Sequence, residues 1–126
     1  MFKWVVAVAL MSISSLVSAD CLNDPRIAGV WGGAMSYGNC KVVTNTKGKI
    51  LPKKSFCRFR TSEKFPVKGN FRVLNDCSIQ AKLIDYEGYE SFGRVAWSID
   101  KNTIVGGLRE IDQGGIDALY LVRITK

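Results

Sequence analysis

The chain has 126 residues, with 18 lysines and arginines against 11 aspartates and glutamates, and a formal net charge of +7. It contains no histidine, which excludes Ser-His and Cys-His catalysis and any metal site built on imidazole. This length is sufficient for one domain behind a short leader.

The first segment, Met1–Ala19, has the three-part pattern of a secretory signal peptide. A positive charge at Lys3 precedes an apolar run, and the small residues Val17-Ser18-Ala19 end the segment. The apolar run is too short to span a bilayer. The pattern predicts cleavage after Ala19 and a secreted or periplasmic domain of residues 20–126, without a transmembrane span and with a net charge of about +6.

Cys21 lies directly behind this cleavage site, so lipid anchoring through its sulfur is an alternative to a free product. A lipoprotein signal requires a small residue before the modified cysteine, and Asp20 occupies that position. We therefore favour an unanchored product that begins at Asp20.

The remaining chain consists of short alternating runs separated by turn residues, the pattern of an all-β protein. No stretch keeps a helical period for three turns. The predicted strands, in chain order, cover Gly29–Tyr37, Lys41–Thr46, Ser55–Thr61, Phe71–Val73 and Cys77–Leu83 around a bulge or tight turn at Asn75-Asp76, Phe92–Ile99, Thr103–Arg109 and Asp117–Thr125.

We expect about seven to nine antiparallel strands in a meander that closes into a small barrel, because closure removes unpaired strand edges. A β-sandwich of two sheets satisfies the same pattern and is the alternative.

All four cysteines, Cys21, Cys40, Cys57 and Cys77, belong to the predicted exported domain. An even count in a small exported domain predicts two disulfides. A zinc site is the competing interpretation, but the sequence has no C-x-x-C pair.

Strand parity favours one of the three possible disulfide pairings. A hairpin of Ser55–Thr61 with Phe71–Cys77 around Pro66 would put Cys57 opposite Cys77 on one face. Cys21 would then join Cys40.

Two separated features resemble the calycin arrangement of lipocalins and avidins. Gly29-Val30-Trp31 opens the first strand after a short non-strand lead, and Arg123 lies in the last strand. In calycins a Gly-x-Trp on the first strand packs near a basic residue late in the barrel. The resemblance implies an up-and-down barrel with a ligand-sized interior or mouth, and makes Trp31 and Arg123 candidate residues of the barrel base or mouth.

The charge is concentrated in one third of the chain. Between residues 41 and 72 Glu63 is the only acid, whereas the bases are Lys41, Lys47, Lys49, Lys53, Lys54, Arg58, Arg60, Lys64, Lys68 and Arg72. Such asymmetry indicates an anionic partner, although the same charges could simply keep a small barrel soluble.

Within this basic third, Arg58 and Arg60 share a strand face with Phe56, and arginine beside an aromatic ring is suited to gripping phosphate or carboxylate groups. We therefore predict a binding patch of Lys53, Lys54, Phe56, Arg58 and Arg60. Nucleic acid is disfavoured as the partner, because no recognition motif is present and few aromatics accompany the bases.

Catalysis has one candidate, the carboxylates of Asp85, Glu87 and Glu90. Two of them at a suitable separation could hydrolyse a glycoside. They lie in a predicted turn, where acids are usually solvated, and they lack the spacing of a calcium loop.

The sequence therefore predicts an exported, non-enzymatic protein, without cofactor or metal, that binds an anionic ligand or acidic protein through a basic surface, the barrel mouth or both. One alternative is an exported inhibitor or immunity protein that blocks a toxin or hydrolase with a protruding loop such as Lys47–Lys54. The other is a small carboxylate-dependent hydrolase.

Overall fold

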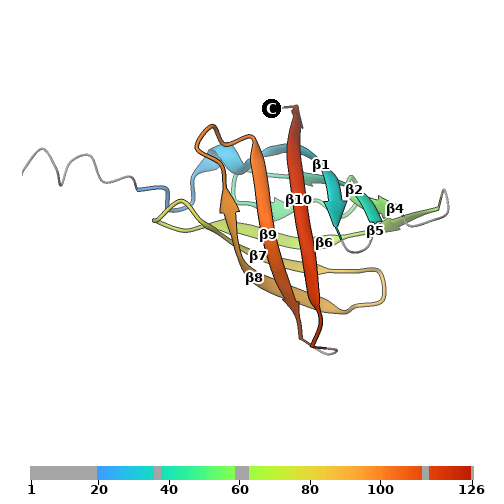
Figure 1. Ribbon diagram of the computed structural model, residues 1–126. Coiled ribbons are helices and arrows are strands. Elements are labelled where there is room, and N and C mark those ends of the chain that lie inside the picture. The colour runs from blue at the N-terminus through green and yellow to red at the C-terminus, as the bar shows by residue number, and fades with distance from the viewer. Residues whose placement is uncertain (1–19, 36–37, 59–62, 112–113, 126) are drawn as a thin grey trace, which may run out of the picture.

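The computed structural model describes residues 20–35, 38–58, 63–111 and 114–125, and this part of the chain contains ten strands and one short 3-10 helix (Figure 1). The predicted leader, residues 1–19, lies outside the described residues. The elements are η1 (Pro25–Ile27), β1 (Gly29–Met35), β2 (Gly38–Thr44), β3 (Lys49–Ile50), β4 (Phe56–Arg58), β5 (Lys64–Pro66), β6 (Lys68–Val73), β7 (Ile79–Ile84), β8 (Glu90–Trp97), β9 (Thr103–Glu110) and β10 (Ile116–Thr125).

Eight of these strands close into an antiparallel barrel. Each strand hydrogen-bonds to the next in the order β1-β2-β3-β6-β7-β8-β9-β10, and β10 pairs back with β1. A short hairpin of β4 and β5 extends from β2. The predicted all-β antiparallel barrel is confirmed, and the sheet closes on itself instead of forming a sandwich.

One strand of the meander is interrupted. β2 pairs with β3 at Thr44 and with β4 at Cys40, so β3 and β4 lie along the same neighbour with residues 51–55 between them. Both backbone polar groups of Val43 on β2 remain hydrogen-bonded at the interruption. Its N–H donates to Ser55 Oγ at 2.9 Å and its carbonyl accepts from Leu51 N–H at 2.8 Å. Of the predicted strand Ser55–Thr61, Phe56–Arg58 forms β4, Ser55 belongs to the loop before it, and residues 59–61 lie outside the described residues.

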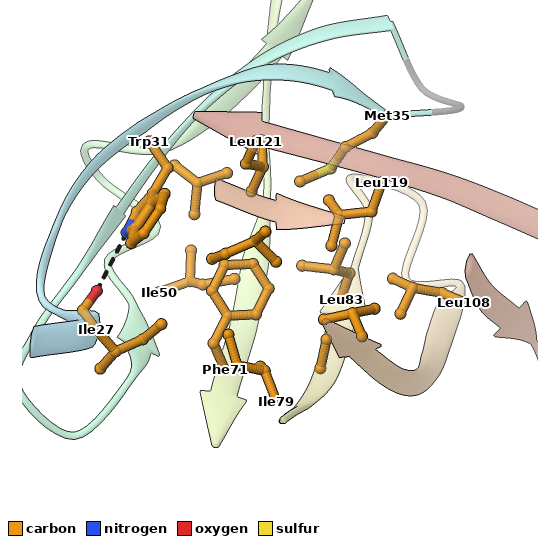
Figure 2. Packing of buried hydrophobic residues seen from close by; sticks show 14 of the residues in the cluster. Ile27, Trp31, Met35, Ile50, Phe71, Ile79, Leu83, Leu108, Leu119 and Leu121 are labelled. Carbon is orange, nitrogen blue, oxygen red and sulfur yellow. Dashed lines mark hydrogen bonds between the residues drawn. The ribbon is translucent and has the colours of Figure 1, made fainter. Parts of the chain in front are cut away.

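The barrel interior is a packed hydrophobic core. Side chains that alternate inward along every strand of the barrel meet there, as two-residue periodicity requires. Figure 2 shows Phe71, Leu83, Leu119 and Leu121 filling the space between the walls. The space that the calycin resemblance made a candidate ligand site thus holds aliphatic and aromatic side chains.

Two disulfides form, as predicted, but the predicted pairing is wrong. The bonds join Cys21 to Cys77 and Cys40 to Cys57. The predicted hairpin of Ser55–Thr61 with Phe71–Cys77 does not exist, because β4 pairs with β2 and β5, whereas β6 pairs with β3 and β7.

The actual neighbours explain both bonds. Cys40 and Cys57 are directly opposite in the β2–β4 pair. Cys77 belongs to a tight turn between β6 and β7, and the incoming chain lies against that turn through a hydrogen bond from Cys21 N–H to the Asn75 carbonyl at 3.2 Å. Two disulfides are consistent with an oxidising environment.

Candidate functional site

Trp31 lies at one end of the barrel and is completely buried. Its indole Nε1–H donates to the Ile27 carbonyl at 3.1 Å, marked in Figure 2, and to Thr44 Oγ at 3.2 Å. Thr44 in turn donates to the same carbonyl at 2.6 Å. Trp31 and Thr44 therefore hold η1 across this end of the barrel, which η1 covers.

Arg123 packs over Trp31, with its guanidinium carbon 4.3 Å from the ring centroid. Its nitrogens donate to three backbone carbonyls, those of Arg26, Ala28 and Lys101, at 2.6–2.8 Å. Burial lowers the pKa of Arg123, because desolvation disfavours the charged guanidinium. The two residues singled out by the calycin resemblance thus meet at the barrel base, where Arg123 links the segment around η1 to the turn between β8 and β9.

The described members of the predicted basic patch lie in two consecutive segments, the turn before β4 and β4 itself. Lys53 and Lys54 are exposed in the turn that separates β3 from β4, and Arg60 lies outside the described residues. Phe56 and Arg58 line a separate shallow hollow of about 430 Å³ on β2 and β4, together with Lys41. Two cations lie against the Phe56 ring: the Arg58 guanidinium carbon is 5.5 Å and Lys64 Nζ is 4.5 Å from the ring centroid.

A larger basic groove lies on the outer face of β3, β6 and β7. Its volume is about 570 Å³, and five cationic side chains and no acidic one line it. We define the basic groove by six of its lining residues, Lys47, Lys49, Lys68, Asn70, Arg72 and Lys82.

Strand register arranges the cations around Asn70. Lys49 and Lys82 are its cross-strand partners on β3 and β7. Lys68 and Arg72 are two residues before and after it on β6, on the same face because strands alternate. The lateral spacing of strands is about 4.8 Å and the two-residue step about 6.7 Å, so the four cations surround the Asn70 amide at short range.

Two glycines allow the chain to approach closely at this groove. Gly48, with φ of 79°, closes the turn before β3, and a Cβ there would collide with the Phe71 carbonyl. Gly69, with φ of 136°, lies on β6, where a Cβ would collide with the Lys82 carbonyl. Both positions suit glycine alone, and they bring Lys49, Asn70 and Lys82 onto adjacent strands.

Most of the positive charge in the groove is uncompensated. Lys82 Nζ lies 3.6 Å from Glu90 Oε1, an exposed and therefore weak ion pair. Lys47, Lys49, Lys68 and Arg72 form no ion pair with any residue in the described part of the chain. The groove is therefore electropositive at neutral pH.

Sequence reasoning placed Lys47, Lys49 and Lys68 in the basic third but did not group them into a site, and Lys82 lies beyond that third. Lys47 lies in the turn before β3 and the other three lysines lie on β3, β6 and β7, so they come together only through long-range strand pairing. The local signal was the shared parity of Lys68, Asn70 and Arg72, which predicts a common outward face.

Of the carboxylates proposed for hydrolysis, Asp85 and Glu87 lie in the turn between β7 and β8, and Glu90 begins β8. Asp85 accepts hydrogen bonds from the backbone N–H groups of Glu87 at 2.9 Å and Tyr89 at 3.0 Å, so it stabilises the turn. Tyr86 stacks on Phe65 with ring centroids 4.3 Å apart, and a hydrogen bond with Glu87 raises its pKa. Glu90 is the partner of Lys82, so each of the three carboxylates has a structural contact.

None of the helices in the described residues has the length and apolar character needed to cross a bilayer. Comparison of the chain with protein-family models, with characterised proteins and with solved structures finds no match.

Proposed function

We propose that the chain is an exported, non-enzymatic binding protein whose basic groove holds an anionic ligand. The observation that carries this proposal is the cluster of five cations that line the groove, four of them next to Asn70 in the strand register, without an acidic residue in the lining. Like charges gathered in a concave site repel one another, and an anion relieves that repulsion while forming charge-assisted hydrogen bonds.

The chemistry of the lining favours phosphate, sulfate or carboxylate groups. Arg72 offers a planar fork for bidentate contacts, and the lysines add point charges. Asn70 supplies a neutral donor and acceptor at the centre. Export, which the leader pattern and the two disulfides support, makes anionic glycans, cell-wall polymers and lipid headgroups the accessible sources of such groups.

The test compares two variants of equal charge. Lys49→Gln/Arg72→Gln removes two cations from the basic groove, and Lys53→Gln/Lys54→Gln removes two from the neighbouring turn. Binding of polyphosphate and of dextran sulfate is measured by calorimetry at several NaCl concentrations. We expect the groove variant to bind at least about tenfold more weakly and the turn variant nearly as tightly as wild type, with affinity falling steeply as salt rises.

Equal weakening by both variants would show that net charge alone attracts these polymers, and the groove would lose its role. Stronger weakening by the turn variant would support the alternative function, an exported inhibitor or immunity protein. That alternative has its own support, because Lys53 and Lys54 are exposed on a turn beside the hollow of Phe56 and Arg58. An acidic hydrolase would then be the partner to test.

A further inference from the structure

A second hollow adjoins the basic groove at the turn between β7 and β8. Its volume is about 350 Å³, and we define the tyrosine hollow by five of its lining residues, Pro52, Pro66, Lys68, Asp85 and Tyr86. Pro52 and Lys68 line the basic groove as well, so the two hollows lie side by side with Lys68 at their common border. A ligand larger than a single phosphate or sulfate group can therefore occupy both.

The Tyr86 ring gives the tyrosine hollow a flat apolar surface. Phe65 on β5 stacks on this ring, with centroids 4.3 Å apart and an angle of 24° between the planes. The stack holds the tyrosine in place, and 48% of the residue remains exposed, so a ligand can reach it. Such a ring is suited to the C–H face of a sugar, because those C–H groups are slightly positive and the face of an aromatic ring is slightly negative.

Asp85 places a hydrogen-bond acceptor beside the ring. Its Oδ1 accepts from the backbone N–H groups of Glu87 and Tyr89 at 2.9 and 3.0 Å, whereas its Oδ2 accepts no hydrogen bond from the described residues. An ionised carboxylate accepts hydrogen bonds and donates none. The tyrosine hollow therefore attracts hydroxyl groups and, unlike the basic groove, repels phosphate and sulfate at the position of Asp85.

The two hollows together require a ligand of mixed chemistry. On one side, Lys68 and the other cations of the basic groove favour anionic groups, and on the other side Asp85 and Tyr86 favour hydroxyl groups and a ring. Inorganic polyphosphate meets only the first requirement, and a neutral sugar meets only the second. An acidic sugar meets both, because its ring, its hydroxyls and its carboxylate or sulfate group belong to one unit.

Nucleic acid also combines rings with anionic groups, but the two hollows fit it less well. Tyr86 is the only aromatic residue in the described lining of either hollow. Proteins that bind single-stranded nucleic acid stack successive bases on several aromatic side chains. The single accessible ring therefore favours a sugar over a run of bases.

We propose that the ligand of the basic groove is an acidic oligosaccharide, one sugar ring of which stacks on Tyr86 and donates hydroxyl hydrogen bonds to Asp85. Its carboxylate or sulfate groups are bound by Lys68 and the other cations of the groove. The assignment of a sugar rests on the proposed function, in which the groove holds an anion, and adds the class of molecule that carries this anion.

Calorimetry with two probes of similar charge, hexagalacturonate and linear polyphosphate, tests the proposal. Tyr86→Ala should weaken hexagalacturonate binding at least about fivefold, as loss of an important interface tyrosine does, and leave polyphosphate binding within about twofold of wild type. Tyr86→Phe keeps the ring and should bind both probes nearly as tightly as wild type. Tyr120→Ala is the matched control, because Tyr120 is 53% exposed on β10, lines neither hollow, and its loss should change neither affinity.

Asp85→Asn tests the second contact. The amide oxygen still accepts the two N–H groups of the turn, whereas an amide nitrogen replaces the free acceptor Oδ2. This variant should weaken hexagalacturonate binding and leave polyphosphate binding as tight as in wild type or tighter, because a negative charge beside the groove is removed.

Near-ultraviolet circular dichroism establishes that each variant keeps the fold. Polyphosphate binding that depends on the groove, together with hexagalacturonate binding that is the same in Tyr86→Ala and Tyr120→Ala, overturns the assignment of a sugar while the proposed function stands. Wild type that binds neither probe overturns the proposed function itself. Tighter binding of oligodeoxycytidylate than of hexagalacturonate, lost in Tyr86→Ala, would assign the ring to a base and would also overturn the proposal.

Discussion

At the level of single residues, Trp31 and Arg123 connect the two ends of the sequence at the base of the barrel. Trp31 provides both packing and two hydrogen bonds, to Ile27 and Thr44. Arg123 holds carbonyls from η1 and from the turn between β8 and β9. Because each side chain contacts segments far apart in sequence, we expect substitutions here to affect global stability.

Trp31→Ala should lower the free energy of unfolding by about 3–5 kcal/mol, as loss of a large core aromatic does. Urea denaturation measures this, and Trp31→Phe is the control that keeps most of the packing while removing the indole N–H. That variant should lose only about 1–2 kcal/mol. A loss below about 1 kcal/mol for Trp31→Ala would mean that the ring contributes little to the base.

Asp24 makes the same region sensitive to acid. Its side chain accepts from Arg26 N–H at 2.9 Å and forms a 2.6 Å ion pair with the Arg26 guanidinium, contacts that lower the pKa of Asp24 below its ordinary value. A carboxyl whose folded pKa is depressed stabilises the fold above its unfolded pKa of about 3.9, and this contribution is lost as pH falls through the folded pKa.

Asp24→Asn should therefore have a lower Tm than wild type at about pH 6, and the difference should narrow as the pH falls below the unfolded pKa of about 3.9 and through the lowered folded pKa of Asp24. Thermal melts followed by circular dichroism over this range provide the measurement. Wild type should still lose stability in acid through Asp76 and Asp100, whose pKa values are lowered by hydrogen bonds from Ser78 and Ser98. A Tm difference that stays the same as the pH falls would contradict the assignment.

At the level of elements, the two disulfides constrain the chain to different degrees. Cys21–Cys77 closes 56 residues and joins the segment before η1 to the turn between β6 and β7, whereas Cys40–Cys57 closes 17 residues within neighbouring strands. In the chain-entropy description a longer loop loses more freedom in the unfolded state when it is closed.

Cys21→Ala/Cys77→Ala should consequently destabilise the protein by about 4 kcal/mol and Cys40→Ala/Cys57→Ala by about 3 kcal/mol. Denaturant titrations of the two double variants supply the comparison. The reverse order of stability would indicate that contacts in the native state, and not loop closure, dominate the effect.

Sequence patterns predicted strand positions better than strand partners. The alternation that places Trp31 inward and Lys68, Asn70 and Arg72 on one face is local, so it is visible in the sequence. The interruption at residues 51–55 is not visible, because it depends on Ser55 satisfying a backbone group of β2. Beyond the interruption β4 pairs with β2, so the disulfide partner of Cys57 is Cys40 and not the predicted Cys77.

At the level of the whole molecule, the barrel and its two disulfides were predictable from strand rhythm and cysteine count. The basic groove was not, because Lys49, Asn70 and Lys82 become neighbours only through long-range pairing. The predicted patch instead grouped cations that are close in sequence, such as Lys54 and Arg58. Their structural surroundings differ, with one in an exposed turn and the other beside Phe56.

The closure of the barrel by β1 and β10 has a kinetic consequence. The first and last strands of the sheet must find each other across nearly the whole domain, and such non-local pairing slows folding to milliseconds or longer. Leu121 pairs with Gly33 across the closing seam, and the strands approach so closely there that a Cβ on residue 33 would collide with the Tyr120 carbonyl. Until β10 has paired with both neighbours, β1 and β9 each have an unpaired edge. A partly folded chain can therefore aggregate through those edges, and the risk ends only when β10 has paired with both β1 and β9.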